Sequence, residues 1–62
     1  MKIVAKIQNA IIGVQELKGE YYFNVLLRND KGYESVFELI QPFDKAVTKA
    51  LECQNMIEFI KQ

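Results

Sequence analysis

The side chains that could do chemistry in this chain are concentrated in residues 18–34, KGEYYFNVLLRNDKGYE. Alternate residues of a strand share a face, so Tyr22 and Arg28 lie on the same side of the strand predicted over residues 20–28. An exposed aromatic ring can stack on a nucleic-acid base while a nearby cation binds a phosphate. We therefore predict a nucleic-acid-binding surface to which six side chains contribute: Lys6, Lys18, Tyr22, Arg28, Lys31 and Tyr33.

The residue types needed for catalysis are scarce. The chain has no histidine, so it lacks the usual general base near pH 7 and any Cys–His nucleophile. Ser35 lies in mid-strand without the turn that exposes a nucleophilic serine. Cys53 alone can form neither a tetrahedral zinc site nor an intrachain disulfide, and we expect it to behave as a small hydrophobe. The sequence therefore predicts no enzymatic activity, no metal and no cofactor.

The balance of charges argues against a strongly basic nucleic-acid-binding surface. Eight basic and eight acidic side chains cancel, whereas strong non-specific nucleic-acid binding needs a surplus of Lys and Arg. Residues 1–33 carry five basic and three acidic side chains, so the modest positive excess lies in the aromatic half. Glu34 and Glu38 share a strand face, where we expect them to be solvated and to repel phosphates.

Hydrophobic periodicity predicts strands in the first two thirds of the chain. Over residues 2–15 the alternation changes phase after Gln8-Asn9, which indicates either one bent strand with a β-bulge or two short strands meeting at a corner. Hairpin turns are predicted at residues 16–20 and 29–32, each with a glycine. They separate strands over residues 20–28 and 33–40. In the first of these strands we expect one face to form the core: Tyr21, Phe23, Val25 and Leu27.

A short amphipathic helix is predicted after Pro42, over residues 43–52. Pro42 suits the start of a helix and Asp44 suits its positive N-terminal end. The helical spacing places five apolar side chains on one buried face: Phe43, Ala46, Val47, Ala50 and Leu51. The segment CQN is expected to end the helix, and alternation in MIEFIK predicts a last strand over residues 56–61.

The predicted order is β-β-β-α-β in a single domain over residues 1–62. A mainly β chain with one short helix and a bent first strand suits a small, partly open antiparallel barrel, OB-like or SH3-like. A domain of this size buries only about 60% of the surface that its unfolded chain exposes, and small domains are often stabilised by oligomerisation. We therefore expect a homodimer, with an open edge of the barrel as a natural place for pairing.

No signal peptide and no membrane span are predicted from the sequence. Lys6 interrupts the apolar stretch at the N-terminus, and no apolar run approaches the roughly 20 residues that span a bilayer. A reduced Cys53 fits the cytoplasm, which is the expected location.

The segment GVQELKGEYYFNVLL, residues 13–27, resembles the first hairpin of small phage-type helix-destabilising proteins. The residues that carry the resemblance are Gly13, Val14, Lys18, Gly19, Tyr21 and Tyr22. It extends over about residues 2–40 and implies an OB-like fold, a dimer and binding of single-stranded DNA. By this analogy Lys18, Tyr22 and Arg28 are the expected contacts.

Two other interpretations of the same residues stay open. The first is an ordinary solvated strand face that carries an amphipathic tyrosine. The second is a protein–protein interaction module, such as a small phage- or plasmid-encoded inhibitor of a host protein. Leu26 and Ile40, placed by alternation on the outer face, favour cover by another subunit or a protein partner.

Overall fold

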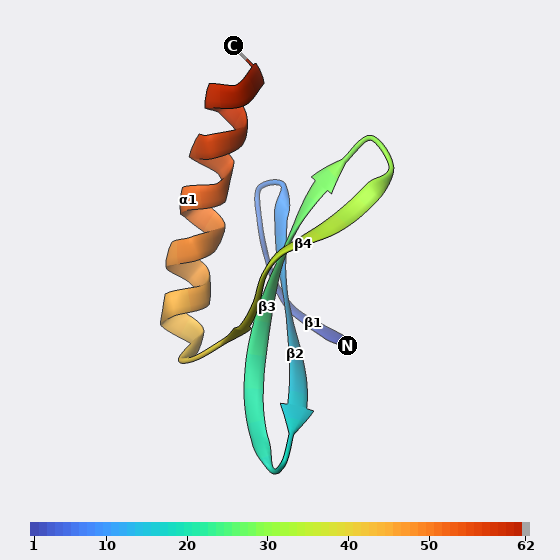
Figure 1. Ribbon diagram of the computed structural model, residues 1–62, viewed down its shortest axis with the longest axis vertical. Helices are drawn as coiled ribbons and strands as arrows, with labels where there is room; N and C mark the ends of the chain where they lie inside the picture. The colour runs from blue at the N-terminus through green and yellow to red at the C-terminus, as the bar shows by residue number, and fades with distance from the viewer. Residues whose placement is uncertain (62) are drawn as a thin grey trace.

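The chain folds into an antiparallel sheet with a single helix on one side (Figure 1). The computed structural model describes the backbone of residues 1–61 and the side chains of residues 1–53. Four strands lie in chain order across the sheet: β1 (Lys2–Ile7), β2 (Ala10–Leu17), β3 (Glu20–Asn29) and β4 (Gly32–Ile40). The helix α1 spans Phe43–Lys61. The predicted mainly β fold with one helix is therefore confirmed.

The two predicted hairpin turns lie within residues 16–20 and 29–32, but the bulge or corner predicted after Gln8-Asn9 is a third hairpin turn. The phase change after Gln8-Asn9 is a tight turn between two separate antiparallel strands, β1 and β2, and Gln8 has a φ of 54°. Gly19 and Gly32 have φ values of 82° and 122°, which glycine adopts at little cost because it has no Cβ. These two glycines let the chain reverse between β2 and β3 and between β3 and β4.

The predicted last strand is wrong, because α1 continues without a break to Lys61. No glycine or proline follows Pro42, so the two residues that most often end a helix are absent from this segment. The segment CQN is compatible with a helix, and the residues after it include Met, Glu and Lys, which are good helix formers. An alternation over only six residues was too short to distinguish a strand from helical turns.

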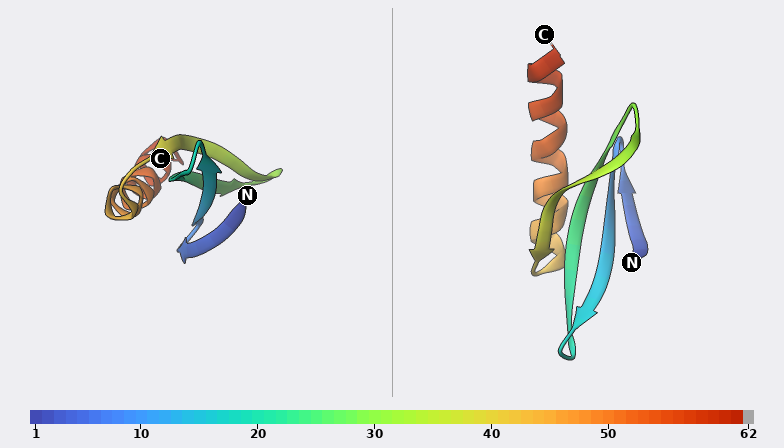
Figure 2. Two further views of the ribbon diagram at one scale, coloured as in Figure 1. Left: turned by 90° about the horizontal axis from the view of Figure 1, so that it is seen from below. Right: turned by 45° about the vertical axis from the view of Figure 1, so that its right-hand side comes forward.

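The sheet stays open and is covered on one side only. β1 pairs with β2 and β4 pairs with β3, but β1 and β4 are not paired with each other in the described part of the chain. Figure 2 shows α1 standing against one face of the curved sheet, with β1 at the edge farthest from the helix. The helix contacts β3 and β2 most, so the two central strands carry its packing.

The core lies between α1 and the central strands. Ile12 and Val25 are the largest fully buried side chains, and they are accompanied by Ala10 and Leu27. The helix contributes three small buried side chains, Ala46, Ala50 and Cys53, which let its backbone approach the sheet closely. At the start of the helix the Phe43 ring packs edge-on against Phe23, with 5.3 Å between ring centroids.

Three side chains that were predicted to be buried are exposed instead: Tyr21, Leu51 and, at 37%, Phe43. Tyr21 is 61% exposed because it lies in the part of the β2–β3 hairpin that extends beyond the first turn of α1 (Figure 1). Leu51 is 48% exposed because it lies about 100° around the helix from Ala50. Cys53 takes its place on the buried face, one turn beyond Ala50.

This arrangement predicts that the smaller of two substitutions destabilises the fold more than the larger one. Ile12→Val removes a single buried methylene and should lower the free energy of unfolding by about 0.5–1.5 kcal/mol. Tyr21→Ala removes a whole phenol ring from an exposed position and should change it by less than about 0.5 kcal/mol. Urea denaturation followed by far-UV circular dichroism measures both values. A larger loss for Tyr21→Ala would contradict the observed position of the helix.

Cys53 should be a protected thiol in the native fold. It is 3% exposed, and burial raises its pKa. The neighbouring Glu52 carboxylate raises that pKa further, while the Lys49 ammonium lowers it. Less thiolate therefore forms at pH 8 than in an unfolded chain.

We predict that Ellman's reagent reacts much more slowly with Cys53 in native buffer than in urea at pH 8. Because the folded pKa lies above the unfolded value of about 8.5, the thiol's contribution to stability is complete below that pH and is lost as the pH rises through the folded pKa. Cys53→Ala should flatten the stability profile above about pH 8.5. Equal thiol reactivity in both buffers would contradict the burial.

Candidate functional site

The face of the sheet opposite α1 is the candidate site, and we call it the open face. The strand register defines its members, because directly paired residues point to the same side. Lys6 pairs with Ile11, Ile11 with Leu26, and Leu26 with Ser35, which gives one row across all four strands. Neighbouring rows add Ile3, Gly13, Gln15, Tyr22, Asn24, Arg28 and Tyr33.

The register brings four of the six predicted binding residues to this face. Tyr22 and Arg28 are on β3, Lys6 is on β1, and Tyr33 is on β4 directly opposite Arg28. A cation and an aromatic ring are therefore cross-strand neighbours at one end of the open face. Arg28 has no ion pair among the residues that the structure describes.

The other two predicted residues lie far from each other. Lys18 is in the β2–β3 turn and Lys31 is in the β3–β4 turn, at opposite ends of the ten-residue strand β3 (Figure 1). A strand of that length spans roughly 30 Å. One short ligand therefore cannot contact both lysines, and only Lys31 is near the Arg28–Tyr33 pair.

The two open-face tyrosines differ in their surroundings. The Tyr22 hydroxyl donates a hydrogen bond to Glu20 Oε2 at 2.9 Å, and this bond, the negative charge of Glu20 and burial together raise the pKa of Tyr22. Tyr22 is half-buried, whereas Tyr33 is 45% exposed. Tyr33 is thus the more accessible ring for stacking, although Tyr22 and not Tyr33 was among the contacts expected from the resemblance.

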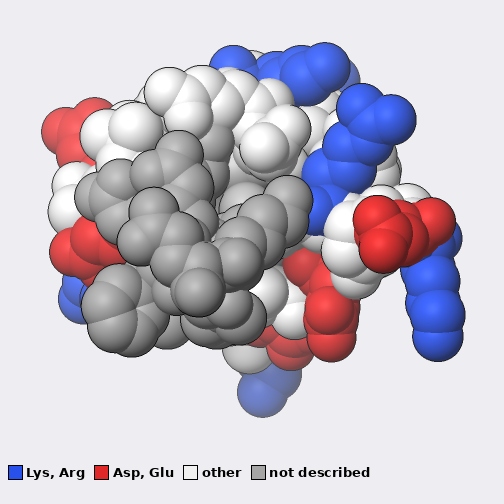
Figure 3. Space-filling view, turned by 90° about the horizontal axis from the view of Figure 1, so that it is seen from above, with Lys and Arg blue, Asp and Glu red and all other residues white. Residues whose placement is uncertain are grey.

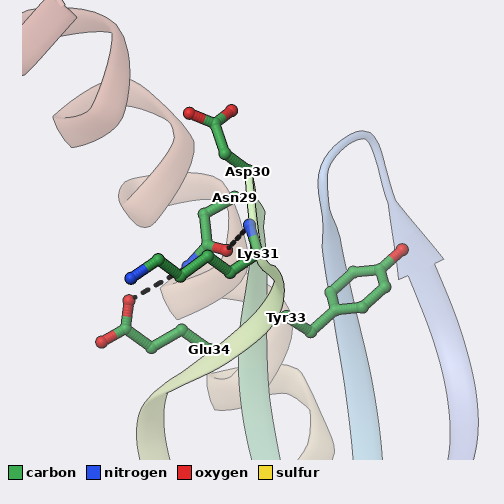
Figure 4. Close-up of a pocket in the computed structure, with 5 residues that line it drawn as sticks. All are labelled: Asn29, Asp30, Lys31, Tyr33 and Glu34. Carbon is green, nitrogen blue, oxygen red and sulfur yellow. Dashed lines mark hydrogen bonds between the residues drawn. The ribbon is translucent and has the colours of Figure 1, made fainter.

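The β3–β4 turn forms a shallow depression lined by Asn29, Asp30, Lys31, Tyr33 and Glu34 (Figure 4). Asn29 Oδ1 accepts a hydrogen bond from the Lys31 amide at 2.8 Å, and Asn29 Nδ2 donates to Glu34 Oε2 at 3.3 Å. Figure 4 shows the Tyr33 ring pointing away from Glu34. Glu34 pairs with Leu27 and belongs to the helix side, so its carboxylate lies off the open face.

Glu34 and Glu38 therefore do not form the shared carboxylate face that the alternation predicted. Two register shifts in the pairing of β4 with β3 disrupt the period of two. Glu38 Oε1 accepts a hydrogen bond from the Ser35 hydroxyl at 3.1 Å, which keeps that carboxylate beside the open face.

Charges of both signs are interspersed at the end of the molecule that carries the β1–β2 and β3–β4 turns. Figure 3 views this end and shows basic side chains along one side with acidic side chains directly beside them. The visible surface is mixed rather than uniformly basic. Long-range attraction of a polyanion is weak on such a surface, so any anion must be held by short-range contacts.

Alternation misplaced Ile40, which lies on the helix side, where it pairs with Phe23 and packs against the core. Asn24 does lie on the open face but is not exposed to solvent there: it is 5% exposed and is the one buried polar side chain among the described residues. Its Oδ1 accepts a hydrogen bond from the Leu39 amide at 2.9 Å, and its Nδ2 donates to Gln15 Oε1 at 2.6 Å. The Asn24 side chain thus binds both neighbouring strands.

Met1 covers the centre of the open face. Asn24 Nδ2 lies 3.3 Å from the Met1 sulfur, and the Met1 side chain packs on the backbone of Gly13 where a Cβ would collide with it. Gly13 is directly opposite Asn24. The sequence contained a signal for this contact. A glycine inside a strand, here Gly13 in the strand paired with that of Asn24, often marks a place where another group approaches the backbone closely.

Comparison with protein-family models, curated proteins and solved structures finds no match to this chain. The resemblance to helix-destabilising proteins therefore stays a prediction from the sequence. Among the described residues there is no helix long and apolar enough to cross a membrane. The same part of the chain holds no group of three His, Cys, Asp or Glu side chains placed to bind a metal ion.

The Asn24 network predicts a specific loss of stability. Asn24→Ala leaves the Leu39 amide without its acceptor and should lower the free energy of unfolding by about 1–3 kcal/mol. Hydrogen exchange at the Leu39 amide should accelerate in the same variant. Gln15→Ala is the matched control, because it removes one Asn24 bond but keeps the Leu39 bond. Equal exchange rates at Leu39 in both variants would contradict the assigned role.

Proposed function

We propose that this chain is a non-catalytic, cytoplasmic binding protein that holds single-stranded nucleic acid weakly on the open face. The observation that carries the proposal is the convergence of Lys6, Tyr22, Arg28 and Tyr33 on the one sheet face that α1 does not cover. These residues come from three strands, so a common face is a property of the register.

The Arg28–Tyr33 pair is the centre of the proposed contact. Directly paired residues on antiparallel strands have Cβ atoms about 4.5–5.5 Å apart, which suits a base stacked on Tyr33 with its phosphate at Arg28. Lys6 lies one row away and can bind a neighbouring phosphate. Lys31 belongs to the adjacent turn, but its side chain points to the Glu34 side, away from the Tyr33 ring (Figure 4), so we assign it no contact. Lys18 is too distant to take part.

The charge of the molecule sets the expected strength. The chain is neutral, and Glu38 stays beside the open face through its bond with Ser35. With only two or three phosphate contacts, affinity should be low and should fall with salt less steeply than for strongly basic proteins. Tyr22 contributes less than Tyr33, because its hydroxyl is held by Glu20 and its ring is half-buried.

A protein partner is the second candidate, and a specific observation favours it. Both edge strands expose apolar side chains, namely Ile3 and Val4 on β1 and Val36 and Leu39 on β4, each between 40% and 50% exposed. Apolar surface of this kind is typical of protein interaction sites. It supports an interaction module, including an inhibitor of a host protein, without any role for nucleic acid.

Titration of a fluorescein-labelled oligothymidylate at low and high salt tests the proposed function. The wild-type chain should bind at low salt with a dissociation constant in the micromolar range or weaker, and salt should weaken it. Tyr33→Ala should cost about 1–3 kcal/mol of binding free energy, the value of one base stacked on an aromatic ring. Arg28→Ala should weaken binding at low salt and make it less dependent on salt, because it removes one phosphate contact. Tyr22→Ala should cost less than Tyr33→Ala.

Tyr21→Ala is the matched control, because this exposed tyrosine belongs to the other face of the same strand. It should bind like the wild type. Absence of binding at low salt with tens of micromolar protein would refute the proposed function. Equal losses for Tyr21→Ala and Tyr33→Ala would refute the assignment to the open face.

A further inference from the structure

The open face of β3 carries opposite charges at its two ends. Along this face the strand reads Glu20, Tyr22, Asn24, Leu26 and Arg28, with alternate residues pointing the same way. The hydrogen bond from Tyr22 to Glu20 places the Glu20 carboxylate on this side of the sheet. Both charged side chains are exposed, whereas the three residues between them are buried or half-buried.

We propose that a second copy of this chain packs face to face on the open face, around a two-fold axis that passes between the two Asn24 residues. The axis lies in the interface and is perpendicular to the strands, so the two β3 strands run antiparallel across it. Glu20 of each protomer then lies opposite Arg28 of the other, and Tyr22 lies opposite Leu26. A two-fold interface needs such a self-complementary surface.

The distribution of apolar surface fits this packing. The middle of the face holds Leu26 and Ile11, which are half-buried, together with Ile3 at 49% and Met1 at 65% exposure. Two sheets stacked face to face lie about 10 Å apart, a gap that side chains of this size fill. The unbranched Met1 side chain lies at the centre and can adapt to the facing copy.

The sheet edges are poorer places for a second copy. β1 carries Lys2 and Lys6 and has a register shift between Ile3 and Ala5. β4 has two register shifts and a left-handed Leu39 with a φ of 56°. Lysines and bulges on edge strands obstruct pairing with another strand. The homodimer expected from chain size is therefore assigned to the face of the sheet and not to its edge.

The dimer does not rest on the proposed nucleic-acid binding, although the two share Arg28. Oligonucleotide and second copy compete for the open face, so each ligand weakens the other through linkage. An oligonucleotide that binds should shift the protein toward the mass of a single chain.

The test uses charge reversal on the full chain and sedimentation velocity without nucleic acid. Glu20→Arg and Arg28→Glu should each weaken self-association at least tenfold, because each variant brings like charges together at the interface. An equimolar mixture of the two variants should associate again, since every Arg then faces a Glu. The double variant Glu20→Arg/Arg28→Glu should also dimerise by itself.

These outcomes are specific to a two-fold packing of β3. Residues 20 and 28 are about 26 Å apart on one strand, so no contact within a chain can produce the rescue. Glu16→Arg, near the same end of the sheet but on the helix side, is the matched control and should dimerise like the wild type. Circular dichroism checks that each variant is folded.

A wild-type chain that sediments at the mass of one chain at about 100 μM and low salt would overturn the proposal. Failure of both the mixture and the double variant to associate would overturn it as well. The oligothymidylate titration tests the proposed function independently of the sedimentation experiment, which tests the dimer. A dimer without oligonucleotide binding would refute only the proposed function, and binding by a strictly monomeric protein would refute only the dimer.

Discussion

The packing of one helix against one side of the sheet is the constraint on which the rest of the structure depends. A chain of 62 residues provides a single helix, and Ala46 and Ala50 let it lie close to Ile12 and Val25. Larger side chains at those helix positions would hold the helix away from the sheet. The close contact concentrates apolar burial in the two central strands and leaves the opposite face without cover from any described element.

The uncovered face is held in shape by a polar contact. Between Val25 and Phe23 the pairing of β4 with β3 shifts, so the regular ladder cannot satisfy every backbone group there. Asn24 compensates for part of this loss. Its side-chain oxygen accepts a hydrogen bond from the amide of Leu39, a residue that the shifted pairing leaves without a partner in the ladder. Burying the Asn24 side chain costs less free energy with hydrogen-bond partners on both neighbouring strands than it would cost without them. The bond to Leu39 also fixes the position of β4 beside β3. The open face is therefore a defined surface with a set register.

Local sequence patterns predicted most strands and turns of this fold. Which side chains are buried depends in several cases on packing between distant parts of the chain, which local patterns do not show. Period-two alternation and the glycines at residues 19 and 32 place the β2–β3–β4 hairpins, and Pro42 marks the start of α1. The shared face of Tyr22 and Arg28 follows from the same period, and the addition of Tyr33 needs only the hairpin register. By contrast, the exposure of Tyr21 depends on where the helix begins, and the burial of Asn24 depends on the backbone of Leu39, fifteen residues away in the chain. The end of α1 was mispredicted because a six-residue alternation fits a helix and a strand alike.

The charge polarity of β3 has opposite consequences for the two proposed occupants of the open face. A nucleic-acid strand presents negative charge along its whole length, so Glu20 restricts it to the end of the face that carries Arg28 and Tyr33. The proposed second copy would present the same polarity reversed, so both ends of β3 would contribute attraction and the apolar side chains of Ile11, Leu26 and Met1 would be buried between them. The zero net charge of the chain weakens attraction of a nucleic-acid strand, but it does not weaken attraction between two copies of the chain. The proposed self-association would therefore use more of the surface that the fold leaves uncovered, and the proposed nucleic-acid contact would use only the part around Arg28.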